Sequence, residues 1–141
     1  MGVAWMPGAS SKLAEHHRRC EALFAAAGEA ANAHDWILLT ARVDSLREAL
    51  LAHFHYEEKR IFPLYEETSG EEGSTEALCA EHDDMRAALW TLATFSAEAQ
   101  PEGYCAELAD LRAAFDVHAA DEERRMYPVF ERMLGANLPQ N

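Results

Sequence analysis

Histidine and glutamate residues that could bind metal ions recur at a fixed spacing in this sequence. The segment HFHYEEKRIFPLYE begins at His53, and the segment HAADEERRMYPVFE begins 65 residues later at His118. In both segments the histidine is followed four residues later by a glutamate, Glu57 or Glu122. Residues four apart lie on one face of an α-helix, so each pair can offer an imidazole and a carboxylate to the same metal. The repeat therefore predicts two matching halves of a metal site.

The offset of 65 residues extends toward the N-terminus of each half, because His17 plus 65 is His82. His17 and His53 are 36 residues apart, and so are His82 and His118. The chain thus looks like two copies of one helical hairpin. Counted from the expected turns, and at a rise of about 1.5 Å per residue, the four histidines fall at nearly the same height.

These side chains lie on the apolar stripes of their helices, as His53 and Glu57 do among Leu46, Leu50 and Ile61. A buried carboxylate without a partner costs on the order of several kcal/mol, so the set needs a common partner. Metal ions supply the missing positive charge, and six ligands suit two ions better than one. Because no cysteine belongs to the set, iron is favoured, with manganese or zinc as alternatives. The predicted metal ligands are His17, His53, Glu57, His82, His118 and Glu122.

Other polar residues near the motifs are interpreted differently. Three further histidines are not expected to be ligands, and these are His16, His34 and His55. His16 has no histidine partner in the repeat, since position 81 is Glu81. Two interpretations stay open for Glu58 and Glu123: each is a surface acid, either solvated or paired with a neighbouring arginine, or each orients a ligating histidine. Tyr56, Tyr65, Tyr127 and Trp90 are expected to be packing residues, although a tyrosine near the metals could donate a hydrogen bond to a bound oxygen species.

Four amphipathic helices must position these ligands, because apolar residues recur at helical spacing and strand-like alternation is absent. The breaks between them predict helices at roughly 10–31, 36–67, 75–98 and 102–134. Short connections favour antiparallel neighbours, so the expected architecture is an all-α, up-down-up-down four-helix bundle in a single domain, 1–141. Pro63 and Pro128 fall inside the second and fourth helices, where we expect a kink or early fraying.

Composition restricts the classes of partner. The formal net charge is −13, from 25 acidic and 12 basic residues, so the protein repels nucleic acids and anionic lipid surfaces. No stretch resembles a signal peptide or a membrane span. Three cysteines without paired spacing suit reduced thiols better than disulfides. We therefore expect a cytoplasmic protein with no nucleic acid or membrane partner; the sequence predicts no particular protein partner.

The sequence resembles the hemerythrin-like family, also called the HHE cation-binding domain, over nearly its whole length. Four motifs in order support the resemblance: H-R-R-C at 17–20, H-F-x-x-E-E-x-x-I-F-P at 53–63, E-H-D-D-M-R at 81–86 and H-x-x-x-E-E-x-x-M-Y-P at 118–128. The resemblance implies a four-helix bundle around a non-haem di-iron centre of two oxo- or hydroxo-bridged iron ions. Glu57 and Glu122 would bridge both irons, and four imidazoles would complete the site.

The sequence departs from the oxygen-carrying hemerythrins at two positions. Those proteins have a second histidine where this chain has Leu78, and an aspartate five residues after the fourth-helix histidine, where Glu122 stands at four. The missing imidazole implies a more open iron. We therefore expect a protein that binds or reacts with oxygen, nitric oxide or peroxide in sensing or stress response. The alternatives are an iron-responsive regulatory module without turnover and a peroxidase- or catalase-like oxidoreductase.

Overall fold

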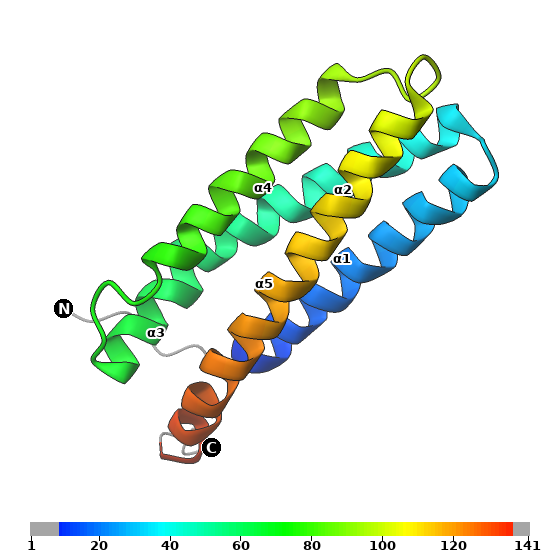
Figure 1. Cartoon of the computed structure of the whole chain (residues 1–141). Helices are drawn as coiled ribbons and strands as arrows, with labels where there is room; N and C mark the ends of the chain where they lie inside the picture. Colours follow the sequence, from blue (N-terminus) through cyan, green and yellow to red (C-terminus); the bar gives the residue numbers. More distant parts are fainter. Residues whose placement is uncertain (1–8, 137–141) are drawn as a thin grey trace.

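The computed structural model describes residues 9–136, and every regular element in that range is helical. The α-helices are α1 (Ala9–Asn32), α2 (Trp36–Tyr56), α3 (Phe62–Ser69), α4 (Glu76–Thr94) and α5 (Pro101–Ala136). A π-helical turn, η1 (Glu57–Ile61), connects α2 to α3 without a break, so the three form one long helical rod. The directions of α1, α2, α4 and α5 alternate along the bundle (Figure 1). This arrangement confirms the predicted all-α four-helix bundle.

Local residue chemistry explains the tight turn between α1 and α2. His34 has a positive φ of 55°, and its ring stacks on that of Trp36 at a centroid distance of 5.3 Å. The next residue, Asp35, is the N-cap of α2, and its carboxylate accepts a hydrogen bond from the backbone N–H of Leu38 at 3.1 Å. Such a cap satisfies a backbone donor that the first helical turn cannot pair internally. The chain therefore reverses within three residues and places α2 against α1.

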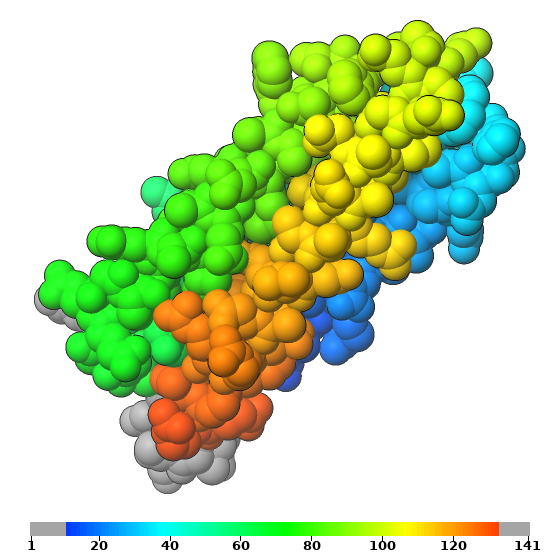
Figure 2. Space-filling view, in the orientation of Figure 1, coloured from blue at the N-terminus to red at the C-terminus, as the bar shows by residue number. Residues whose placement is uncertain are grey.

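The helix boundaries match the expected ones closely, except at the end of α4. The sequence predicts helix up to position 98, but α4 ends at Thr94 because Phe95 adopts extended backbone angles. Ser96 then starts a new turn, in which its side-chain oxygen accepts the N–H of Ala99 and its carbonyl oxygen accepts the N–H of Gln100. A serine that offers its side chain to the backbone competes with helix continuation. Figure 2 shows α4 and α5 packed side by side along one face of the bundle.

The two internal prolines have different structural consequences, although they occupy equivalent places in the repeat. Pro63 follows the π-helical turn, in which the N–H of Phe62 donates to the carbonyl of Glu57, five residues back. A π-turn widens the helix just before a residue that cannot donate a hydrogen bond. Pro128, in contrast, lies inside an uninterrupted α5, so the early fraying expected there is wrong. Among the described residues, a π-helical turn thus precedes Pro63 but not Pro128.

A layer of buried polar side chains separates two apolar clusters in the bundle. One cluster, toward the α1–α2 turn, includes Phe24 and Leu50. The other, toward α3, includes Leu13 and Ile61. On α1, His17 lies between Leu13 and Phe24 in sequence, which places its imidazole in the layer between the clusters. The core is therefore apolar at both ends and polar at mid-height.

Candidate metal centre

The polar layer contains all six of the predicted ligands, and every one of them is buried. Among the described residues they form two overlapping groups whose candidate ligand atoms lie within 4.8 Å of one another. One group is His17, His53, Glu57 and Glu122, and the other is Glu57, His82, His118 and Glu122. The two carboxylates belong to both groups. The structure thus brings the six residues together, while their role as metal ligands stays a prediction.

Three of the four imidazoles are oriented by a carboxylate outside this cluster. The Nδ1–H of His17 donates to Oε1 of Glu123 at 3.0 Å. The corresponding atom of His82 donates to Oε2 of Glu58 at 2.7 Å, and Glu58 also accepts a hydrogen bond from Arg86 at 2.9 Å. Donation from Nδ1 leaves Nε2 to face the centre of the bundle, the arrangement found when a carboxylate orients a ligating histidine.

The third of these carboxylates is Glu81, the first residue of the E-H-D-D-M-R motif, to which sequence reasoning assigned no role. The Nδ1–H of His118 donates to its Oε1 at 2.6 Å. Two signals in the sequence could have indicated it: its place one residue before His82, and its position equivalent to His16 in the repeat. As for Glu58 and Glu123, both of the open interpretations apply in part: each orients a histidine, and Glu58 also pairs with an arginine.

Inside the layer, nitrogen and oxygen lone pairs converge at short distances. The Nε2 atoms of His82 and His118 lie 3.0 Å apart, and Nε2 of His82 lies 2.9 Å from Oε1 of Glu57. Nε2 of His17 lies 3.0 Å from Oε1 of Glu122. When Nδ1 carries the ring proton, two facing Nε2 lone pairs at this distance repel each other unless a proton or a cation lies between them. The interior of the layer is therefore built to hold positive charge.

Several polar atoms in the layer form no well-aligned hydrogen bond among the described residues, even where a polar atom of a neighbouring side chain lies 3.2 Å away. They are Nε2 of His53, Oε2 of Glu57 and Oε2 of Glu122. A buried carboxylate oxygen or imidazole nitrogen without a partner is costly, and metal coordination would satisfy all three atoms. Imidazole nitrogens and carboxylate oxygens without thiolate suit iron or manganese, and they also bind zinc. The residues present thus fit metal ions in both groups.

The pKa values of the metal-free protein reflect the same crowding of charge. Burial and the negative charge of Glu57 raise the pKa of Glu122. Burial opposes ionisation of Glu57 as well, but hydrogen bonds from Glu122 and the imidazoles of His118, His53 and His82 outweigh it and hold its pKa well below its usual range. Burial would lower the pKa of His118, yet hydrogen bonds to Glu122 and Glu57 raise it to about 10. Protons therefore supply part of the positive charge that metal ions would otherwise supply.

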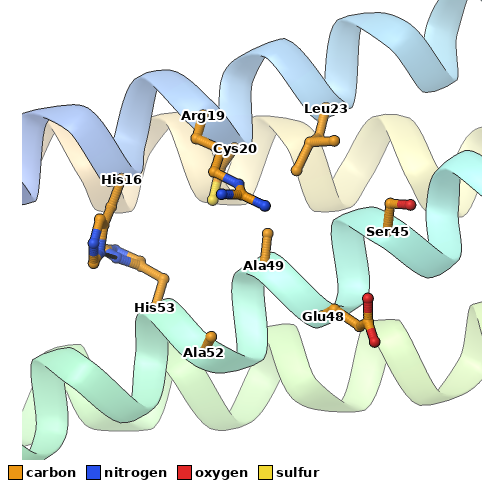
Figure 3. A pocket seen from close by; sticks show the side chains of 9 residues that line it. All are labelled: His16, Arg19, Cys20, Leu23, Ser45, Glu48, Ala49, Ala52 and His53. Carbon is orange, nitrogen blue, oxygen red and sulfur yellow. Dashed lines mark hydrogen bonds between the residues drawn. The ribbon is translucent and has the colours of Figure 1, made fainter.

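His53 differs from the other imidazoles because a histidine occupies the place of its outer carboxylate. Nδ1 of His53 lies 3.2 Å from Nδ1 of His16, and burial together with the nearby His53 lowers the pKa of His16. The two rings meet edge to face, with centroids 5.3 Å apart, at one end of a cavity of about 350 Å³ between α1 and α2 (Figure 3). Sequence reasoning excluded His16 as a ligand and did not identify it as a partner of one.

The remaining candidates lie where the sequence indicated, except Trp90, which is 71% exposed, so its expected packing role is wrong. His55 is exposed on α2, and His34 lies in the α1–α2 turn. Leu78 is fully buried in the apolar cluster next to α3, so that position supplies no imidazole. Tyr127 donates a weak hydrogen bond to Glu123 at 3.3 Å, outside the six-residue cluster.

Comparison with known proteins agrees with this geometry. The family model of the hemerythrin HHE cation binding domain matches residues 9–130 of the chain, a range that includes all six cluster residues. No curated protein and no solved structure gives a significant match. Within the described residues, no helix is both long and apolar enough to cross a membrane. The family match and the buried histidine and glutamate cluster together indicate metal-ion binding.

Proposed function

Because this chain belongs to the hemerythrin HHE cation-binding domain family, we propose that it is a non-haem di-iron protein that binds or reacts with a small oxidant. Oxygen, nitric oxide and peroxide are the candidate oxidants, and sensing or stress response is the proposed role. One observation carries the proposal: Glu57 and Glu122 belong to both four-residue groups. Two carboxylates shared between two sets of imidazoles are the arrangement that a bridged pair of ions requires.

The number of protein ligands supports reaction with an external molecule. Each group offers two imidazoles and two shared carboxylates, which is four protein ligands per ion. Iron that is held by few protein ligands keeps positions open for a small molecule, as in other non-haem iron sites. Buried Leu78 adds no further imidazole. When bound, the iron pair would supply the redox chemistry, while the protein orients the imidazoles, excludes bulk water and holds the Nδ1 protons of His17, His82 and His118 against the outer carboxylates.

Metal content and spectroscopy test the proposal directly. We expect close to two irons per chain, with near-ultraviolet charge-transfer bands that bleach on anaerobic reduction and return on exposure to air or peroxide. The double variant His53→Gln, Glu57→Gln should lose the response, whereas His55→Gln, on the exposed face of the same helix, should keep it. One zinc per chain, or full reactivity in the double variant, would rule out the di-iron proposal.

A second candidate is an iron-responsive regulatory module without turnover. The observation that favours it is the origin of the ligands, which come from α1, from the rod formed by α2 and η1, from α4 and from α5. Metal bound at mid-height would therefore tie every long helix of the described bundle together, and occupancy would control stability. This candidate predicts a metal-free form that melts far below the loaded form, and a loaded form whose spectrum does not change with oxidant.

A further inference from the structure

The outer partners of the imidazoles follow the internal repeat. His17 and His82 are equivalent positions, and so are their partners, because Glu58 plus 65 is Glu123. Each of these imidazoles therefore donates its Nδ1–H to a carboxylate that stands one residue after a cluster glutamate. At this pair of positions the two halves of the centre are chemically alike.

The second pair of outer partners breaks the repeat. His53 and His118 are equivalent, and their partners also occupy equivalent positions, because 16 plus 65 is 81. The partner of His118 is the carboxylate of Glu81, whereas the partner of His53 is the imidazole of His16. The lone difference among the four outer contacts thus concerns one of the two four-residue groups, the one that contains His17 and His53.

The difference affects how strongly His53 can donate to a metal. If Nε2 of His53 faces the centre, its Nδ1–H must donate to the lone pair on Nδ1 of His16. A neutral imidazole is a weaker acceptor than a carboxylate, and an outer carboxylate raises the basicity of a ligating histidine. His53 is therefore the poorest donor of the four imidazoles.

The imidazole of His53 also borders a cavity that opens to the surface. The cavity between α1 and α2 is lined by His16 and His53 at one end and by Arg19 and Ala49 farther along (Figure 3). Its volume of about 350 Å³ is more than ten times the roughly 30 Å³ that one water occupies in the liquid. Water can therefore approach the outer edge of the His16–His53 pair.

We propose that the two metal positions are unequal, and that the position held by His17 and His53 binds its ion more weakly and exchanges it faster, because His16 replaces a carboxylate there. The inference rests on the proposed two-metal centre. His16 acts as a positioning residue here, since it contacts His53 and belongs to neither four-residue group. Substitution by glutamate would give this position the residue type found at the equivalent Glu81.

Stepwise metal binding to metal-free protein tests the inference, with anaerobic Fe²⁺ and, separately, Co²⁺ as the probes. Wild-type protein should bind two ions in two resolved steps and release one of them faster to a chelator. His16→Glu should lower the dissociation constant of the more weakly bound ion. His16→Leu should raise that dissociation constant and leave the other unchanged. Each change should be about 10- to 100-fold. His16→Gln, whose amide oxygen can accept the Nδ1–H of His53, should lie close to wild type. Conversely, Glu81→Gln should raise the dissociation constant of the other ion, the one held by the group that contains His118.

Two control variants separate positioning from general charge effects. Arg19→Gln changes the charge of the same cavity by −1, as His16→Glu does, but Arg19 makes no hydrogen bond with His53 in the described structure, so this variant should leave both binding steps unchanged. His55→Leu tests the loss of an exposed imidazole on α2. Two ions bound with a single affinity, or an equal effect of Arg19→Gln and His16→Glu, would overturn the inference and leave the di-iron proposal intact. Fewer than two ions in wild type would overturn both.

Discussion

At the scale of single residues, the centre depends on charges that only a shared partner can balance. Glu57 lies 2.9 Å from Nε2 of His82, 3.2 Å from Nε2 of His53 and 3.7 Å from Nε2 of His118. No other side chain of the cluster approaches three imidazoles at these distances. Its negative charge and its position between the two groups make it the residue on which binding of both ions depends.

Glu57→Gln tests this dependence. An amide has nearly the same shape as a carboxylate but carries no negative charge, so the variant should fold and hold well under two metals per chain. Metal content after loading and desalting is the measurement. Glu48→Gln is the matched control, because Glu48 is exposed on α2 and should leave the content unchanged. Two ions retained by Glu57→Gln would show that this carboxylate does not bridge them.

At the scale of elements, the same sequence motif gives two different helices. The second rod contains a π-helical turn that begins at Glu57, whereas α5 passes through Glu122 without one. π-turns inside helices are frequent at functional sites, since the extra residue changes the direction of the side chains around it. The repeat therefore supplies equivalent ligands on helices whose local geometry differs.

Two glycines allow a test of how the helices are specified. Gly28 lies within α1, where an added Cβ would be 3.9 Å from the guanidinium of Arg112, an ordinary contact. Gly70 ends α3 with a φ of 75°, and nothing lies within 4 Å of a Cβ built there. Gly28→Ala should therefore raise the free energy of unfolding by about 1 kcal/mol, since alanine is the better helix former.

Gly70→Ala should lower the free energy of unfolding by about 1 to 2 kcal/mol, because a left-handed conformation strains a residue that has a Cβ. Urea denaturation of the metal-free protein measures both changes. The opposite signs are the essential outcome. If both substitutions shifted stability in the same direction, the helix-end geometry at Gly70 would not be the cause.

At the scale of the whole molecule, the polar layer links stability to pH and to metal. In the metal-free protein the pKa of His118 is raised from 6.5 to about 10, and that of His17 is raised as well. A raised pKa in the folded state stabilises the protein fully below the unfolded value of about 6.5. This stabilisation is lost as the pH rises through about 10.

The melting temperature of the metal-free protein should therefore fall between pH 7 and pH 10. In the metal-loaded protein the ions replace these protons, so the fall should be smaller over the same range. Thermal denaturation of both forms, with metal-free His118→Gln as the comparison, provides the measurement. That variant lacks the titrating imidazole and should show a weaker pH dependence than metal-free wild type. If the melting temperature fell equally with pH in the loaded and the metal-free protein, protonated imidazoles would not be the cause of the fall.

The sequence by itself determined the bundle and the membership of the polar layer. Hydrophobic periodicity specified the helices to within a few residues, because a face buried along a whole helix leaves a repeated pattern in the chain. The offset of 65 residues identified His17, His53, His82 and His118 with their two glutamates, since a repeat places equivalent side chains at equivalent heights. The family match and the helical architecture agree with those expectations.

Only the tertiary structure decided which side chains contact the Nδ1 atoms of the imidazoles. Glu81 and His16 lie on α4 and α1, while the histidines that they contact lie on α5 and α2. Contacts between helices depend on rotation and distance, which the spacing within one helix does not encode. The π-turn before Pro63 and the end of α4 at Thr94 were missed for a related reason. Both depend on how backbone donors and acceptors are satisfied after packing, whereas the motif around each proline is nearly the same.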